Sequence, residues 1–253
     1  MRFDVVTLFP DLFGPHLSQG ITRRAFESAQ IDVRLWQLRD FADNTYRRVD
    51  DRPYGGGPGM VMLAEPLLRA LERIRADRAE APESATAVVF FTPTGQRLDQ
   101  ALVTEFAAGP GAVLLCGRYE GVDQRLIDAQ VTHELSLGDF VLSGGELPAL
   151  ALLDAVARLQ DGVLTAPSHQ QDSFSDGLLE GPSYSRPELL RVDGAEQPVP
   201  AVLLSGHHAQ ITRFKREKSL ALTARRRPDL IVAARAAGRL STADEKFLGQ
   251  LGL

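Results

Sequence analysis

Residues 114–148 read LLCGRYEGVDQRLIDAQVTHELSLGDFVLSGGELP, and this stretch decides the predicted fold. The apolar run 112–116 predicts a buried strand that ends at Gly117. A second extended segment is predicted to end in residues 140–143, directly before the glycines 144–145. Glycine lets the backbone approach a ligand closely, and ligands of open α/β sheets bind beyond the carboxyl ends of the strands. The stretch therefore predicts a ligand-binding edge built from two loops.

The glycine-rich loops lack the signatures of phosphate binding. Neither GxxxxGK[ST] nor GxGxxG occurs in the stretch, and the second glycine cluster, 55–59, has Met60 where a further glycine is required. Backbone groups beside Leu137, Leu142 and Pro148 suit an uncharged heterocycle better than a polyphosphate. On the glycines alone, two ordinary tight turns in an α/β protein explain the pattern equally well.

Outward from this stretch, strand patterns alternate with helical patterns. Further strands are predicted at 3–9, 31–38 and 88–91, the last of them ending in residues 92–95. Helices are predicted from the Pro10-Asp11 turn to about residue 29 and at 65–78, 98–107, 122–129 and 146–160. Several strands are apolar on both faces, which is typical of a mostly parallel sheet covered by helices. The residues alone therefore predict a Rossmann-like α/β domain.

The chain is predicted to divide into two domains. Residues 1–160 form the α/β domain, and the Ser-, Gln-, Asp- and Pro-containing segment 161–176 is interpreted as a flexible linker. Short apolar runs and helical patterns dominate 177–253, which predicts a small helical C-terminal domain. The irregular segment 40–59 is long for a loop in a compact domain, and such loops are usually functional or mobile.

Composition indicates a soluble globular protein of the cytoplasm. Hydrophobic residues make up 44% and charged residues 24% of the 253 positions. We find no apolar run near the ~20 residues of a membrane span and no signal-peptide pattern, so we expect no membrane association. The single cysteine, Cys116, excludes an internal disulfide framework and is expected to be a buried structural thiol. One cysteine and five scattered histidines give no zinc-ligand spacing, so no metal site is predicted.

The charge is distributed unevenly along the chain. The formal net charge is −5, yet residues 211–239 contain nine Lys or Arg and only two acidic residues, Glu217 and Asp229. A local basic face is what contact with nucleic-acid phosphates requires. A solvated helix face remains the alternative interpretation of this charge run.

Two segments of the central stretch carry a family resemblance. LLCGRYEGVD (114–123) and SLGDFVLSGGELPA (136–149) closely resemble the signature segments of the bacterial tRNA (guanine-N1)-methyltransferases, the TrmD type of the SPOUT class. The resemblance covers nearly the whole chain, because further segments match in order and with similar spacing. They are VVTLFPDLF (5–13), VDDRPYGGGPGM (49–60), FFTPTGQRLDQ (90–100), DSFSDGLLEGPSYSRPE (172–188) and VPAVLLSGHHAQI (199–211).

The resemblance implies a SPOUT fold, in which a deep trefoil knot threads the chain around 116–149, although general topology rules argue against knots. It also implies that S-adenosyl-L-methionine is held by the knot loops, with Gly59 nearby. The implied donor-binding positions are Phe90, Thr92, Pro93, Gly117, Tyr119, Glu120, Leu137, Leu142, Gly144, Gly145 and Pro148. Phe90 departs from some family members, which have Tyr there. Glu120 can oppose the positive charge of the donor, and a surface ion pair with Arg118 is the open alternative.

The implied reaction is methyl transfer to N1 of the guanine at position 37 of tRNA, next to the anticodon. N1 carries a proton, so the chemistry needs a base near N1 and a cation near O6. The family pattern places these at Asp172 and Arg158. Without the resemblance, Asp172 is interpreted as a linker residue or helix N-cap and Arg158 as an exposed helix charge.

The resemblance further implies a homodimer in which the donor is bound by one subunit and Asp172 is supplied by the other. The C-terminal domain is expected to bind the tRNA anticodon arm. The candidate phosphate contacts are Arg213, Lys215, Arg216, Arg225, Arg226 and Arg227. Phe214 stands where family members often have Trp, which leaves its role open. Mg²⁺ is also left open as a second cofactor.

Three other functions remain as alternatives. An RNA-binding module with a degenerate donor pocket is separated from the enzyme by a donor-binding titration. A SPOUT enzyme acting on a ribose 2′-hydroxyl needs no base near a nucleobase N1, so mapping the methyl group separates it. A nucleotide-dependent dehydrogenase is disfavoured because the dinucleotide fingerprint is missing.

Overall fold

The computed structural model describes residues 1–78, 86–164 and 172–252. The chain divides into two compact units, Met1–Thr165 (unit 1) and Ala166–Leu253 (unit 2). Each unit is described by itself. Seven of the sixteen residues of the predicted linker, 165–171, lie outside the described residues.

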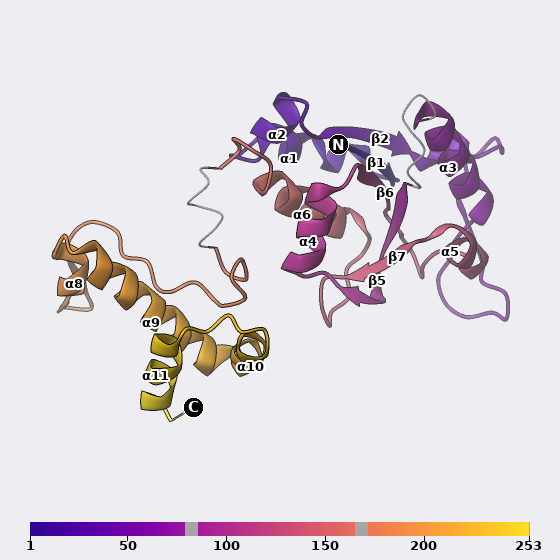
Figure 1. The fold of residues 1–253 in the computed structure, drawn as a ribbon. Coiled ribbons are helices and arrows are strands. Elements are labelled where there is room, and N and C mark those ends of the chain that lie inside the picture. The colour runs from indigo at the N-terminus through magenta and orange to yellow at the C-terminus, as the bar shows by residue number, and fades with distance from the viewer. Residues whose placement is uncertain (79–85, 165–171, 253) are drawn as a thin grey trace. The chain divides into compact units, whose positions relative to one another are not determined.

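Unit 1 is built on a five-stranded sheet with the strand order β2-β1-β6-β5-β7 (Figure 1). Every neighbouring pair in this sheet is parallel, which confirms the predicted α/β fold with a mostly parallel sheet. The strands are β1 (Arg2–Thr7), β2 (Asp32–Gln37), β5 (Ala87–Arg97), β6 (Gly111–Leu115) and β7 (His133–Ser136).

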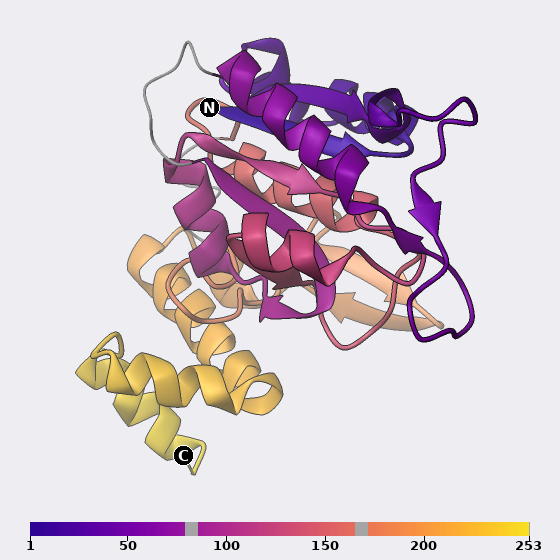
Figure 2. The ribbon, with the colours of Figure 1, turned by 90° about the vertical axis from the view of Figure 1, so that its right-hand side faces the viewer.

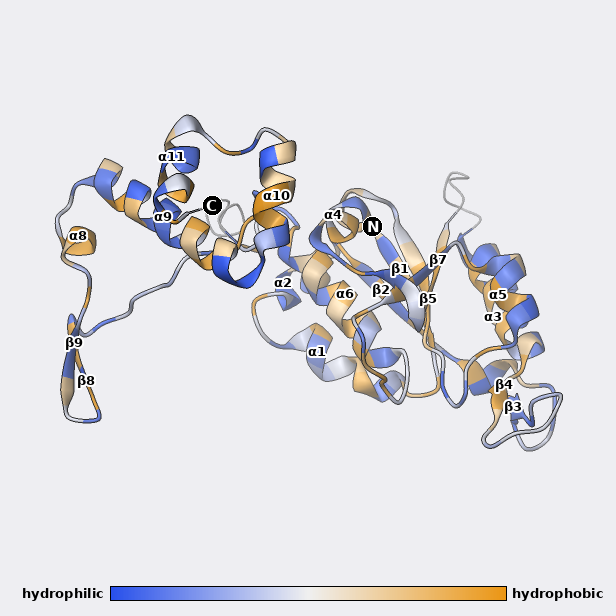
Figure 3. Ribbon diagram, turned by 90° about the horizontal axis from the view of Figure 1, so that it is seen from below, coloured by the Kyte–Doolittle hydropathy of each residue, from blue (hydrophilic) through white to orange (hydrophobic). Residues whose placement is uncertain are grey.

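Helices cover both faces of the sheet (Figures 1 and 2). One face carries α1 (Gly14–Ser18), α2 (Arg23–Glu27), α4 (Gln100–Ala108) and α6 (Glu146–Arg158). The other carries α3 (Ala64–Arg78) and α5 (Gln124–Gln130), and α3 shows a hydrophobic and a hydrophilic side in Figure 3. Successive strand side chains point to opposite faces, so Leu114 packs into the first core and Leu115 into the second. Two cores explain why β6 is buried along its whole length.

Shorter elements surround this framework. The segment after β1 forms η1 (Pro10–Leu12) and then α1 and α2, so the helical stretch predicted to about residue 29 is present but divided into three short helices. Gly20 has φ +72°, a conformation that separates α1 from α2. After β2 come η2 (Leu38–Phe41) and the antiparallel pair of β3 (Asp50–Asp51) and β4 (Val61–Met62).

The second extended segment of the central stretch lies earlier than predicted. The strand is β7, which ends at Ser136, and residues 137–145 form a loop. Gly138 has φ +148°, and its amide donates to the Ser136 hydroxyl at 3.2 Å, which turns the chain away from the sheet. Phe140 and Val141 made the segment resemble a strand, but their side chains are 53% and 84% exposed.

The strand predicted at 88–91 does not end at Thr92. β5 continues to Arg97, and its pairing with β7 shifts register between Phe91 and Gln96, as a β-bulge does. Gly95 lies against the Glu134 backbone, where a Cβ atom has no room. The bulge displaces residues 92–95 toward the edge of the sheet where β6 and β7 also end.

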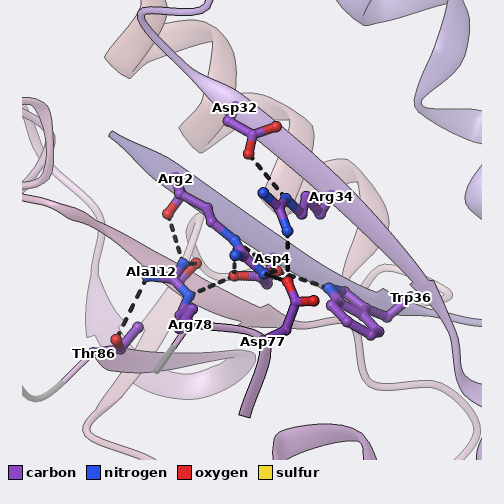
Figure 4. A network of polar contacts seen from close by, with 9 residues as sticks. All are labelled: Arg2, Asp4, Asp32, Arg34, Trp36, Asp77, Arg78, Thr86 and Ala112. Atoms are coloured by element: carbon purple, nitrogen blue, oxygen red, sulfur yellow. Dashed lines mark hydrogen bonds and ion pairs between the residues drawn. The ribbon is translucent and has the colours of Figure 1, made fainter. Parts of the chain in front are cut away.

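A polar network closes the opposite edge of the sheet, where the strands begin (Figure 4). Asp4 is fully buried and accepts hydrogen bonds from Arg2 and Trp36, while Arg78 of α3 donates to it at 2.6 Å. Arg78 also donates to the Arg2 carbonyl at 2.7 Å. The network therefore fixes the end of α3 to β1 and β2 at the edge away from the glycine-rich loops.

Unit 2 contains a helical core and a β-hairpin. Its helices within the described residues are α8 (Ala201–Leu204), α9 (His208–Arg226), α10 (Pro228–Ala236) and α11 (Thr242–Gln250). Leu178 packs with Leu220, Ile231, Ala234 and Leu248 in a small core. The hairpin of β8 (Leu189–Val192) and β9 (Ala195–Pro198) was not predicted. Among the residues that the structure describes, no helix combines the length and apolar character that crossing a membrane requires.

Candidate functional site

A pocket opens at the edge of the unit 1 sheet where β5, β6 and β7 end. Its volume is about 270 Å³, near the lower end of the ~300–1,000 Å³ typical of small-molecule sites. Its walls come from the β5 bulge, from the loop after β6, from the loop after β7 and from the first turn of α6. The position agrees with the rule that ligands of parallel sheets bind beyond the strand carboxyl ends.

All eleven predicted donor-binding residues line this one pocket. They are Phe90, Thr92, Pro93, Gly117, Tyr119, Glu120, Leu137, Leu142, Gly144, Gly145 and Pro148. They come from three segments that are distant in sequence, so the fold brings them together. What they bind stays a proposal.

Two glycines of the pocket lie where no side chain fits. A Cβ atom on Gly145 would stand 2.7 Å from the Cys116 Cα, and one on Gly117 would stand 2.7 Å from the Phe90 ring. The Gly145 amide donates to the Gly117 carbonyl at 3.0 Å. The loop after β7 therefore lies directly on the end of β6, and the backbone itself forms a wall of the pocket.

Glu120 lines the pocket with an exposed side chain. Its amide donates to the Met60 carbonyl at 2.9 Å, and Gly59 lies against its side chain. The preceding residue, Tyr119, has φ +59°, which is uncommon outside glycine. This turn holds the carboxylate at the mouth of the pocket, where it can attract a cationic ligand.

Arg118 is held by Glu146 rather than by Glu120, so the alternative of an Arg118–Glu120 ion pair is wrong. Its Nε donates to Glu146 at 2.9 Å, and the Thr7 hydroxyl donates to the other oxygen of the same carboxylate at 2.8 Å. Glu146 is 1% exposed, and the Arg118 guanidinium lies 4.5 Å from the Phe9 ring centre. This network joins the end of β1, the loop after β6 and the start of α6.

Cys116 is free and buried directly under the pocket loops, as the sequence predicts. Burial raises the pKa of its thiol well above 9.0, and the negative charge of Glu146 adds to that effect. A raised pKa disfavours the thiolate, so the buried thiol fits a packing role.

The comparisons with known proteins identify the family. A profile described as "tRNA (Guanine-1)-methyltransferase TrmD" matches residues 1–233. The chain belongs to the TrmD family. A Methylibium petroleiphilum protein named tRNA (guanine-N(1)-)-methyltransferase is 68% identical to it over 99% of this chain and 98% of that protein. Proteins of the same name from Leptothrix cholodnii and Janthinobacterium are 67% and 53% identical, each over 99–100% of both chains. The TrmD match spans the pocket and most of unit 2.

The two residues predicted for catalysis in the TrmD pattern do not line the pocket. Arg158 is the last residue of α6, whereas Pro148 near the start of that helix is a pocket residue. Ten residues of helix separate them by about 15 Å. Asp172 belongs to unit 2 and is partly buried, and its carbonyl accepts from the Ser175 amide at 3.2 Å. Unit 1 alone therefore does not bring Arg158 to its own pocket.

The six cations predicted to contact RNA fall into two groups. Arg213 and Arg216 of α9 both pair with the buried Asp244 of α11, and Arg227 pairs with Asp229. The other three, Lys215, Arg225 and Arg226, are exposed on α9. The two pairs with Asp244 fix α11 to α9, and the Arg227–Asp229 pair is local to the junction of α9 and α10. The second group presents charge to solvent.

The described part of the chain contains no cluster of metal ligands. No group of three His, Cys, Asp or Glu side chains there could hold a metal ion.

Proposed function

We propose that this chain transfers a methyl group from S-adenosyl-L-methionine to N1 of the guanine at position 37 of tRNA. One observation carries the proposal: a single pocket gathers every residue that the TrmD pattern assigns to the donor. The high identity to proteins named tRNA (guanine-N(1)-)-methyltransferase supports the same reaction. Bound S-adenosyl-L-methionine would supply an electrophilic methyl group on a sulfonium ion.

The residues present fit such a donor. The glycine backbone at 144–145 and 117 leaves amides and carbonyls accessible to an adenine edge. Leu137, Leu142 and Pro148 supply an apolar surface for the ring. Glu120 presents a carboxylate to the positive sulfonium, which favours the charged donor over its neutral product. The proposal therefore assigns the binding and orientation of the donor to residues of the protein alone.

The acceptor needs proton removal, because guanine N1 carries a proton and is not nucleophilic while it does. Asp172 accepts this proton, and Arg158 stabilises the negative charge that gathers on O6. Both assignments come from the TrmD pattern. They supply the two charges of opposite sign that the transition state requires.

We place these residues in a homodimer with a shared site. The distance of Arg158 from the pocket of its own chain supports this arrangement, because a partner subunit can bring the two together. The proposal includes a SPOUT-type trefoil knot around 116–149, which the contact of Gly145 with Gly117 supports. It also assigns residues 1–160 to donor binding and 177–253 to the tRNA anticodon arm, with 161–176 as the linker.

The decisive test separates donor binding from transfer. We expect Asp172→Ala to reduce methyl transfer to an unmodified tRNA transcript by at least about 100-fold, the usual contribution of a general base. Donor affinity, measured by calorimetry, should change by less than about twofold because Asp172 does not line the pocket. Retained methylation of N1 by this variant contradicts the assignment.

Product mapping and transcript sequence test the acceptor. The methyl group is expected on N1 of guanine, and a transcript with adenine at position 37 should accept none. A methyl group on a ribose 2′-hydroxyl would show a different SPOUT reaction. Failure of the wild-type chain to bind the donor would leave an RNA-binding module as the better description.

A further inference from the structure

An open groove of about 780 Å³ lies on unit 2, beside the exposed face of α9. Its lining residues combine three cations with an apolar floor, and none of them is acidic. They are Pro182, Lys218, Ala221, Leu222, Ala224, Arg225, Arg226 and Leu251. We call this feature the α9 groove. It is separate from the donor pocket, all of whose residues belong to unit 1.

The cations of the groove differ in their contacts from Arg213 and Arg216 of the same helix. Arg213 and Arg216 are bound to Asp244, which leaves little of their charge for another ligand. Within the described ranges, Lys218, Arg225 and Arg226 have no ion pair with a carboxylate. Lys218 instead contacts an aromatic ring, because its ammonium lies 5.3 Å from the centre of the Phe214 ring.

A purely local role explains only part of this arrangement. Arg225 and Arg226 occupy the last turn of α9, where cations stabilise a helix by about 0.3–1 kcal/mol through its dipole. Lys218 lies two turns earlier and gains nothing from that effect. A helix-dipole role also requires no apolar floor between the cations, and Leu222 and Ala221 provide one.

We infer that the α9 groove holds a tRNA backbone segment with an unpaired nucleotide. Lys218, Arg225 and Arg226 contact consecutive phosphates, which supply most of the affinity of RNA for a basic surface. The floor formed by Leu222, Pro182 and Leu251 receives the face of a ribose or base, and a free Arg guanidinium plane can stack on the base. This inference rests on tRNA being the substrate, and it selects which cations of unit 2 bind it.

The selection differs from what the charge pattern alone predicts. Lys218 was not among the predicted RNA contacts, whereas Arg213, Arg216 and Arg227 were, and the structure gives those three carboxylate partners. RNA binding therefore depends on the groove residues, and the ion-paired arginines act on the stability of unit 2.

A pair of triple variants with equal charge loss tests the groove. The groove variant is Lys218→Gln/Arg225→Gln/Arg226→Gln. The control is Arg186→Gln/Arg191→Gln/Lys246→Gln, which removes three exposed cations of unit 2 outside the groove. Affinity for an unmodified tRNA transcript is measured at several salt concentrations, together with donor affinity and the melting temperature of each protein.

We expect the groove variant to bind tRNA about 50- to 200-fold more weakly at about 0.15 M salt, and to lower the salt slope of log K by about 2–3. The control should change affinity less than about threefold. Donor binding should be unchanged in both. Equal losses in the two variants, or an unchanged slope in the groove variant, would overturn the inference. A wild-type chain that neither binds nor methylates tRNA would instead overturn the proposed function.

A second variant keeps every cation and changes only the floor. Leu222 lies outside the core of unit 2, so Leu222→Asp places a carboxylate in the groove without removing a core side chain. Leu204→Asp, at an exposed apolar residue of α8, is the matched control. We expect Leu222→Asp to weaken tRNA binding at least about tenfold and Leu204→Asp less than about twofold. Equal effects of the two changes would show that the floor does not contact RNA.

Discussion

Single residues explain the shape of the pocket. Positions 145 and 117 require glycine because neighbouring atoms leave no room for a Cβ atom. Turn geometry is not the reason, since neither residue has a positive φ. Tyr119, in contrast, adopts a left-handed conformation at the pocket mouth, which costs about 1 kcal/mol or more. Close backbone packing and one strained turn together fix where a ligand can lie.

Gly145→Ala should therefore weaken donor binding. The added methyl group would stand 2.7 Å from the Cys116 Cα, so the loop must move by a few tenths of an ångström or more. Overpacking of this kind costs about 1–3 kcal/mol, which corresponds to roughly a 5- to 150-fold rise in the donor Kd measured by calorimetry. Gly14→Ala is the control, since nothing lies within 4 Å of that Cβ position. If Gly145→Ala leaves donor binding unaffected, the pocket is not the donor site.

The sequence predicts the members of the pocket but not the buried charge of Glu146, which lies behind the pocket loops. Glycines and apolar residues at strand ends are visible in the pattern, and the family resemblance assigns them to one ligand. Glu146 carries no such sign, because a glutamate in the first turn of a helix is ordinary. Its burial follows from the packing of α6 against Thr7 and Arg118, which are distant in sequence.

At the scale of elements, the Arg118–Glu146 pair connects α6 to two strands. Glu146→Gln keeps the shape of the side chain but leaves Arg118 without its countercharge. Because Arg118 is 19% exposed, the expected loss in the free energy of unfolding is about 2–4 kcal/mol, below the ~3–5 kcal/mol of a fully buried pair. Urea unfolding of both single variants and the double variant with Arg118→Gln gives the coupling energy.

The exposed pair of Asp123 and Arg125 is the control for this cycle. Arg125 is 80% exposed, so Asp123→Asn should cost less than about 1 kcal/mol. A coupling energy for Arg118 and Glu146 as small as that of the exposed pair would show that the network does not hold α6 in place.

In unit 2, Asp244 of α11 connects that helix to α9. Burial by itself would raise the pKa of Asp244, but hydrogen bonds from Ser241 and the ion pair with Arg216 outweigh it, so the pKa lies below 3.8. Because the pKa of Asp244 is lowered in the folded state, its ionised carboxylate stabilises the fold. This contribution is complete above pH 4 and is lost as the pH falls through the folded pKa.

Asp244→Asn should therefore reduce the stability of unit 2 at neutral pH by roughly 1–3 kcal/mol. It should also flatten the fall in stability that is expected of the wild-type chain below about pH 4. Unfolding followed as a function of pH checks both effects. The same acid loss in the variant and the wild type would show that Asp244 does not carry it.

The sequence predicts a helix well where the hydrophobic period extends over many residues. The prediction fails where the local backbone conformation decides the structure. α3 and α6 were placed within two residues of their bounds. The strand predicted at 88–91 is too short, because β5 continues through the bulge at 92–95 to Arg97. The β8–β9 hairpin had a usable signal in Asp193-Gly194, whose φ angles of +50° and +80° fit the two-residue turn that Asp-Gly favours.

At the scale of the whole molecule, the proposed chemistry is divided between the two units. The donor pocket lies in unit 1, whereas Asp172 and the α9 groove belong to unit 2. The division into units could be predicted from the change in pattern near residue 161. The shared site is implied only by the family resemblance and stays a proposal, because single-chain patterns carry no information on which chain completes a pocket.

Mixed dimers test the shared site. Asp172→Ala chains keep an intact pocket, and Gly145→Ala chains keep Asp172, so a mixed dimer has one complete site of two. Co-refolded equal amounts should recover about a quarter of wild-type activity, since half the dimers are mixed. The donor concentration is kept well below the raised Kd of Gly145→Ala, so each variant alone should show little transfer. No recovery above the sum of the separate variants would place the site within one chain.

The pocket walls come from three chain segments between residues 90 and 148. A compound seated there contacts all three at once and so raises the temperature at which the protein melts, by an amount set by its concentration and affinity. Fluorescence-monitored melting can therefore rank candidate inhibitors without any nucleic acid in the assay.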